Sequence, residues 1–359
     1  MTTPTSTSED TSAEPRANFL NAKVSERHSV NSHSAFSSLS IRGILTGPGS
    51  GPFRMNRVES FPANRLFSLE DECLTENEGW DALPLPQNKF LLEIELTEQI
   101  AHGRIGVTYG ARLQRILDRT DDSPIPCSSL ESPQEFCVKL VKPQFMRSLA
   151  REAWFYEQLA ELQGVVVPQF FGFFVAPLPD GITWIDAWGE LEDEEMSCES
   201  HSDDSQEESY CHPDSLDDDL EDFAFREDGR QSKSSSRWND WRHSPESPLV
   251  GVLLLELGSA LERRTQAYFT EQEKLEFADL LDDLSSVGIG HCDFKFNNVL
   301  DTSHSMAQKF CPRHGRIHPY RVIDFDRSRK WGKTVVNDDD LYTRLQRKTL
   351  TFADVFWCL

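Results

Sequence analysis

Long apolar runs, an excess of positive charge and a regular cysteine pattern are all missing from this sequence of 359 residues. The longest apolar run, residues 249–255, is only long enough for a strand, so we expect no membrane-spanning segment. The formal net charge is −24, which argues against binding to nucleic acids or anionic membranes through a general positive field.

The eight cysteines are irregularly spaced, so we expect no disulfide framework and a reducing compartment. The N-terminus shows no apolar core followed by a small-residue cleavage site, so we expect no secretory signal. These observations predict an intracellular protein, cytoplasmic or nuclear, which we expect to be a monomer.

Two segments have the composition of disordered chain. Residues 1–60 are rich in Ser, Thr, Pro and Gly and have few aliphatic residues, although Phe36, Leu39 and Ile41 could dock elsewhere. Residues 186–247 contain 21 Asp and Glu against 5 Lys and Arg, a net charge of −16. We therefore predict a disordered N-terminal segment over 1–60 and one folded domain over 61–359, which a disordered acidic insertion interrupts over 186–247.

Apolar periodicity predicts the regular elements of this domain. Strands are expected over residues 90–96, 135–141, 165–175, 249–257 and 320–323, and helices over 145–162, 270–284 and 338–356. In the second helix, Thr270 is expected as the N-cap with Glu273 as its capping-box partner. Its inward-facing residues are predicted to be Leu275, Ala278, Leu281 and Leu284.

Residues 288–300 carry four polar residues at a spacing suited to phosphoryl transfer: His291, Asp293, Lys295 and Asn298. Such chemistry needs a carboxylate to orient the attacking hydroxyl, a cation to neutralise the phosphate and ligands for a metal ion. The stretch resembles the catalytic loop of the eukaryotic protein-kinase superfamily, His-Arg-Asp-Leu-Lys-x-x-Asn. The resemblance implies that Asp293 and Lys295 are catalytic and that Asn298 binds Mg²⁺. The alternative is a polar turn between two buried segments.

Other motifs of that family follow in the expected order. Residues 100–111 resemble its glycine-rich phosphate loop, which implies a nucleotide contact for Ala101 (in place of the first glycine), Gly103 and Gly106. Lys139, in the strand 135–141, resembles the lysine that contacts the α- and β-phosphates, and Glu152 the glutamate that orients it; the alternative for Lys139 is a strand-edge lysine that extends into water.

The resemblance also covers the adenine and metal sites. It implies that backbone groups of Glu256 and Leu257 meet adenine and that Asp324, in Asp-Phe-Asp, binds Mg²⁺. It further implies an α+β, two-lobed kinase-like fold: a small antiparallel β-sheet lobe with one helix and a reduced helical large lobe. The expected ligands are ATP and Mg²⁺.

Besides Ala101, the sequence departs from the family pattern at three further points. Cys292 replaces the arginine of His-Arg-Asp, Asp326 replaces the glycine of Asp-Phe-Gly, and no Ala-Pro-Glu follows. The whole pattern resembles the compact kinase-like proteins of mushroom-forming and other fungi. It implies an ATP- and Mg²⁺-dependent phosphotransferase with an unknown protein or small-molecule acceptor. A nucleotide-binding or scaffold module without catalysis and a small-molecule kinase are the alternatives.

Cys311, His314 and His318 are close enough in sequence to suggest a zinc site. Only one cysteine and two histidines are present, and no partner pair is evident, so a surface loop is favoured.

Overall fold

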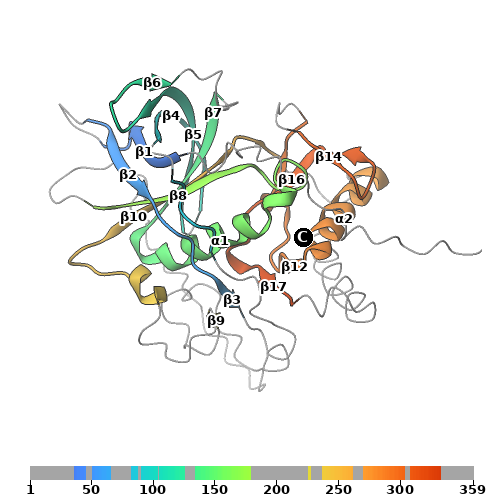
Figure 1. Ribbon diagram of the computed structural model, residues 1–359. Coiled ribbons are helices and arrows are strands. Elements are labelled where there is room, and N and C mark those ends of the chain that lie inside the picture. The colour runs from blue at the N-terminus through green and yellow to red at the C-terminus, as the bar shows by residue number, and fades with distance from the viewer. Residues whose placement is uncertain are drawn as a thin grey trace, which may run out of the picture. The chain divides into compact units, whose positions relative to one another are not determined.

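The computed structural model describes residues 36–45, 51–65, 82–87, 90–103, 105–125, 134–178, 225–227, 237–261, 270–303 and 308–332. They belong to one compact unit, residues 32–359. Seven strands form its largest feature, a closed mixed barrel in the order β4-β1-β2-β8-β10-β7-β5, which β5 closes by pairing back to β4 (Figure 1). Their bounds are β1 Phe36–Arg42, β2 Phe53–Arg57, β4 Phe90–His102, β5 Gly106–Asp118, β7 Glu135–Val141, β8 Phe170–Pro177 and β10 Leu249–Glu256.

All pairs in the barrel are antiparallel except one. β1 runs parallel to β4, with Leu39 opposite Leu92 and Ile41 opposite Ile94. β6 (Pro124–Ile125) extends the sheet beyond β5. The parallel pair is what makes the barrel mixed, because it inserts the first strand of the chain between β4 and β2.

The described residues contain two α-helices, α1 (Met146–Gln158) and α2 (Glu271–Ser286). Short strand pairs accompany them, and in Figure 1 most of these lie around α2. The remaining strands are β3 Ala63–Arg65, β9 Phe225–Glu227, β11 Ser259–Ala260, β12 Ile289–Gly290, β13 Val299–Asp301, β14 Phe310–Cys311, β15 Arg316–Ile317, β16 Tyr320–Val322 and β17 Arg329–Lys330.

Alternation along β10 separates two apolar cores. Val250, Val252 and Leu254 belong to the core inside the barrel, whereas Leu253 and Leu255 pack in a second core with α1 and α2. The strand is buried on both faces, which explains its continuous apolar sequence. In the neighbouring β7 the same alternation sends Val138 into the barrel, so Lys139 points to the opposite, helix-bearing side.

The predicted fold class is wrong. A two-lobed fold with a small antiparallel sheet lobe and a helical large lobe would need an open sheet and several large-lobe helices. The structure instead has a closed, mixed seven-stranded barrel, and its described residues are mostly strand with only two α-helices. The third predicted helix, residues 338–356, lies outside the described part of the chain.

Disorder was predicted for residues 1–60, but two stretches of that segment are strands of the barrel. Phe36, Leu39 and Ile41 of β1 and Phe53 and Met55 of β2 are buried in its core. The folded unit therefore includes strands that precede residue 61. The predicted acidic insertion, 186–247, lies outside the described residues except for 225–227 and 237–247.

The two helices confirm most of the local predictions. The Thr270 side chain accepts a hydrogen bond from the Glu273 amide, and the Glu273 side chain accepts one from the Thr270 amide, as a capping box requires. The predicted inward face is wrong at Leu275, which is 58% exposed, whereas Phe277 and Leu280 are buried. Neither described helix is long and apolar enough to cross a membrane.

The segment predicted as a surface loop, residues 301–319, contains a short hairpin, β14 and β15, against α2. Cys311 is 1% exposed and His318 is fully buried. The surface-loop interpretation is therefore wrong for these two residues, because both face the acidic side of α2 instead of solvent.

Candidate active site

A cavity of about 480 Å³ lies where the turn between β4 and β5, the strand β7, the helix α1 and the loop around residues 291–298 meet. Nearly every residue that the sequence singled out lines it. These residues are Ala101, Gly103, Gly106, Lys139, Glu152, Glu256, Asp293, Lys295, Asn298 and Asp324. Leu257 is half-buried and does not line the cavity, whereas its neighbour Gly258 does.

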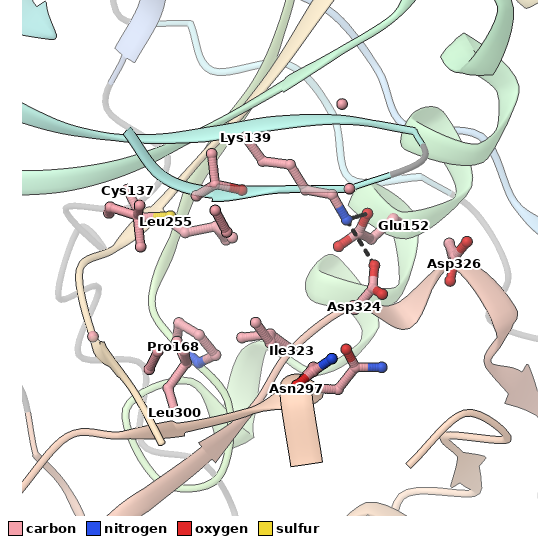
Figure 2. Close-up of a pocket in the computed structure, with 18 of the residues that line it drawn as sticks. Cys137, Lys139, Glu152, Pro168, Leu255, Asn297, Leu300, Ile323, Asp324 and Asp326 are labelled. Carbon is pink, nitrogen blue, oxygen red and sulfur yellow. Dashed lines mark hydrogen bonds and ion pairs between the residues drawn. The ribbon is translucent and has the colours of Figure 1, made fainter. Parts of the chain in front are cut away.

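Lys139 is the charged centre of the cavity. Its Nζ lies 2.7 Å from Oε2 of Glu152 on α1 and 2.7 Å from Oδ1 of Asp324, which follows β16. Figure 2 shows both contacts converging on the lysine from different elements. The alternative of a strand-edge lysine in water does not hold, because the Lys139 side chain is only 15% exposed.

Lys139 faces two carboxylates, those of Glu152 and Asp324, so the three groups comprise one cation and two acids. Burial opposes the charge on Lys139, but Asp324 and Glu152 more than offset it and hold the lysine pKa well above its usual range. Burial raises the pKa of Glu152 to about 7, although Lys139 opposes the shift. Burial also acts to raise the pKa of Asp324, but the charge and hydrogen bond of Lys139 bring it below its usual value. Glu152 is thus the carboxylate that protonates first.

The loop that carries Asp293 is anchored by a buried histidine. Nε2 of His291 lies 2.8 Å from the carbonyl of Ile323, so this nitrogen carries the proton, and Nδ1 accepts the Asp293 amide at 3.3 Å. Burial keeps the pKa of His291 below its usual value. The next residue, Cys292, has a φ of 56°, a conformation that non-glycine residues seldom adopt. The loop thus holds a strained turn that aims Asp293 into the cavity.

Two neighbours orient the Asp293 carboxylate. Lys295 Nζ lies 2.9 Å from Oδ2. The Asn298 side-chain amide donates to the Asp293 carbonyl at 2.9 Å and approaches Oδ2 at 3.3 Å. Since the amide nitrogen of Asn298 faces Asp293, its amide oxygen is the atom that can bind a cation.

Carboxylate oxygens gather at one end of the cavity. Asp293, Asp324 and Asp326 each offer an oxygen, and these three atoms lie within 4.8 Å of one another. Asp324 has a φ of 70°, so the backbone is held in a sparsely populated conformation where its carboxylate meets Lys139. From the sequence, Asp326 was identified only as the residue that replaces the glycine of Asp-Phe-Gly. The structure shows it as a third candidate ligand, brought into place by the 3-10 turn Phe325–Arg327.

The turn between β4 and β5 covers the cavity, with the Gly103 amide bonded to the Gly106 carbonyl at 2.9 Å. A Cβ on Gly106 would lie 2.1 Å from the Leu140 carbonyl oxygen, so only glycine fits where β5 meets β7. A Cβ on Gly103 would meet only the Gly106 carbonyl oxygen, at 3.9 Å. Gly106 is thus needed for strand pairing, whereas Gly103 lies in an open part of the turn.

The far end of the cavity is apolar. In Figure 2, Cys137 and Leu255 lie across the space from Pro168, Leu300 and Ile323. The sequence did not predict these residues, although their elements were predicted. The backbone amide of Glu256 donates to the Gln169 carbonyl at 2.9 Å, and the Glu256 carboxylate accepts the Gln169 amide at 3.0 Å. The Glu256 amide is therefore engaged within the protein.

No protein-family model matches the sequence, and no curated protein matches it either.

Proposed function

We propose that this protein transfers a phosphoryl group from Mg²⁺-bound ATP to an alcohol group. The observation that carries the proposal is the convergence of Lys139, Glu152, Asp293, Asn298 and Asp324 on one cavity from segments far apart in sequence. A lysine held by a helix glutamate, a carboxylate beside a second lysine and an Asn–Asp pair are the groups that positioning and charge stabilisation of a phosphoryl group require.

The cavity suits the two ends of a nucleotide. Its volume of about 480 Å³ lies within the range of small-molecule sites, about 300–1,000 Å³. The apolar end, with Leu255, Leu300 and Ile323, offers surfaces for a flat base. The opposite end, with Lys139 beside the turn between β4 and β5, offers a cation for phosphates.

The oxygen donors suit Mg²⁺. Asp324, Asp326 and Asp293 supply carboxylates and Asn298 an amide oxygen, the hard ligands that this ion prefers. When bound, Mg²⁺ would neutralise charge on the phosphates. Lys139 would position the phosphates, held in place by Glu152, and Asp293 would orient the acceptor hydroxyl while Lys295 stabilises negative charge beside it.

One observation favours a second candidate, a module that binds nucleotide without catalysis. The Asp293 carboxylate already pairs with Lys295 and contacts Asn298. Both contacts engage the same oxygen, Oδ2, which is then not open to an acceptor hydroxyl. Apart from Asp293 and Lys295, the residues that line the cavity would contact only the nucleotide and the metal, so the proposed acceptor is an alcohol group of a protein or of a small molecule.

The test is Asp293→Asn, which keeps the shape of the side chain and removes its charge. We expect phosphate transfer from labelled ATP, to the protein itself, to generic protein substrates or to a panel of small alcohols, to fall by about 100-fold or more. Stabilisation by Mg-ATP in a thermal melt should persist, at about 2.7 kcal/mol for a ligand at 100 times its dissociation constant. The matched control is Asp240→Asn, an exposed aspartate outside the cavity.

Three outcomes decide between the readings. Loss of transfer with retained Mg-ATP stabilisation supports the phosphotransferase. Stabilisation by Mg-ATP without transfer in the unmodified protein supports the binding module and overturns catalysis. Absence of any stabilisation by Mg-ATP overturns both.

A further inference from the structure

A second cluster of ligand-type side chains lies where α2 meets the β14–β15 hairpin. It combines Asp283 of α2, Cys311 at the end of β14, His314 in the β14–β15 turn and His318 before β16. Their donor atoms all lie within 4.8 Å of one another, and none of these residues lines the nucleotide-sized cavity. Asp283, Cys311 and His318 are at most 1% exposed.

The separations of the donor atoms match the edges of a small tetrahedron. Oδ2 of Asp283 lies 3.2 Å from Sγ of Cys311, 3.3 Å from Nδ1 of His314 and 3.3 Å from Nε2 of His318. Sγ of Cys311 lies 3.6 Å from Nδ1 of His314. Zinc binds such atoms at about 2.0–2.3 Å, which in tetrahedral geometry places neighbouring ligands roughly 3.3–3.7 Å apart.

One buried nitrogen of His318, Nε2, has the Asp283 carboxylate as its polar neighbour. Nδ1 of His318 lies 3.3 Å from a Glu276 carboxylate oxygen, so Nδ1 carries the proton and Nε2 exposes a lone pair. Nε2 makes no hydrogen bond. Its nearest polar neighbour is the Asp283 carboxylate, 3.3 Å away but not aligned for a hydrogen bond, and both atoms are then acceptors. Two lone pairs that face each other in a buried site repel, and a cation between them would stabilise both.

The surroundings orient both histidines as metal ligands are usually oriented. His318 turns Nδ1 outward to Glu276, and His314 turns Nε2 outward to Asp279 and Asp282, at 3.6 and 3.4 Å. A carboxylate behind the imidazole fixes the tautomer and raises the basicity of the inner nitrogen. The backbone amide of His314 also points at Sγ of Cys311, at 3.4 Å.

We propose that Asp283, Cys311, His314 and His318 bind a structural Zn²⁺ ion. All four positions are filled by protein groups, which is typical of structural sites, whereas catalytic sites leave one position open. Binding would release the Cys311 thiol proton to solvent, and one carboxylate, one thiolate and two neutral imidazoles would balance the two charges of the ion. The buried centre would then be neutral. Sequence reasoning missed the site because its fourth ligand, Asp283, lies 28 residues before Cys311.

The ion would join α2 to the β14–β15 hairpin. The chain between Asp283 and Cys311 contains both Asp293 and Asn298. The metal would therefore link the two ends of the segment that carries the candidate catalytic loop. The inference does not depend on the proposed function, because it concerns metal content and folding only.

The experiment uses the full chain expressed with added Zn²⁺. We expect about one equivalent of zinc per chain by elemental analysis after extensive dialysis, and a melting temperature that falls when a strong chelator removes the ion. Replacement by Co²⁺ should give the intense visible bands of a tetrahedral site and a thiolate-to-cobalt charge-transfer band. Cys311→Ser should abolish the charge-transfer band, and His318→Ala should lower the metal content. The matched control, His243→Ala at an exposed position, should retain one equivalent.

The spectrum of the unmodified protein keeps the test decisive even if the variants fold poorly. A chain that folds with less than about a tenth of an equivalent of zinc and gives no tetrahedral cobalt spectrum overturns the proposal. A cobalt site without a thiolate band also overturns it, because the bound metal would then lie elsewhere.

Discussion

Replacing Glu152 by glutamine should make the protein more stable at neutral pH and less active. The glutamate is 1% exposed, and its Oε1 makes no hydrogen bond, so its charge is costly in the folded state despite the contact with Lys139. Glutamine keeps the shape and an oxygen for Lys139 but cannot ionise. Lys139 keeps its second carboxylate, Asp324.

The magnitude follows from the pKa of Glu152, which burial raises from 4.5 to about 7. Below pH 4.5 the side chain is protonated in both folded and unfolded chains and costs nothing. Between the two values the unfolded chain ionises first, so stability falls as the pH rises. Above pH 7 the folded state has lost about 3 kcal/mol, at about 1.4 kcal/mol for each pKa unit. Between pH 5 and pH 8 the expected loss is about 2.5 kcal/mol.

The assay is urea denaturation of the wild type and Glu152→Gln at several pH values. The free energy of unfolding of the variant, relative to the wild type, should rise by about 2.5 kcal/mol from pH 5 to pH 8. A constant offset from the lost or gained hydrogen bonds does not matter, because only the slope with pH reports the ionisation. Glu161→Gln removes the same charge from an exposed position and should show no such slope. A difference that stays flat over this range would refute the argument for a costly buried charge.

Three further predictions concern the barrel and the cavity. Gly106→Ala should destabilise the protein by about 1–3 kcal/mol or more, because the added Cβ meets the Leu140 backbone. Gly103→Ala should be neutral, and chemical denaturation of the two variants checks both expectations. Ile41→Ala should cost about 2–5 kcal/mol in the same assay, and no cost would mean that β1 is not part of the core. Lys139→Met should cost about 3–5 kcal/mol by leaving the buried Glu152 and the partly exposed Asp324 without their cation, and it should remove stabilisation by Mg-ATP in thermal melts; a variant as stable as the wild type would argue against the ion pairs.

The elements that carry the candidate site were predictable because each has a strong local signal. β7 alternates apolar residues around Lys139, and the Thr270–Glu273 capping box marks the start of α2. The spacing of Asp293 and Asn298 places both on one short loop. Such features depend on neighbours in sequence, and the folded chain keeps them.

Features that depend on distant parts of the chain were missed. In β1 the buried Ser38 and Ser40 give the segment a composition typical of disorder, although the alternate residues fill the barrel. In α2 a three-residue repeat drifts by about 60° at each step, so Leu275 and Leu284 lie on opposite sides of the helix. The barrel also contains a parallel pair, β1 with β4, between strands about fifty residues apart, for which local periodicity gives no signal.

The closed barrel also sets an order of events during synthesis. β1 and β2 leave the ribosome first, but the ring is complete only when β10, which ends at Glu256, fills the place between β8 and β7. Until the chain has been made as far as Glu256, β7 and β8 must wait for the strand that lies between them. Closing a ring through such distant segments is slow, so newly made chains depend on protection from aggregation for longer than chains with local pairings.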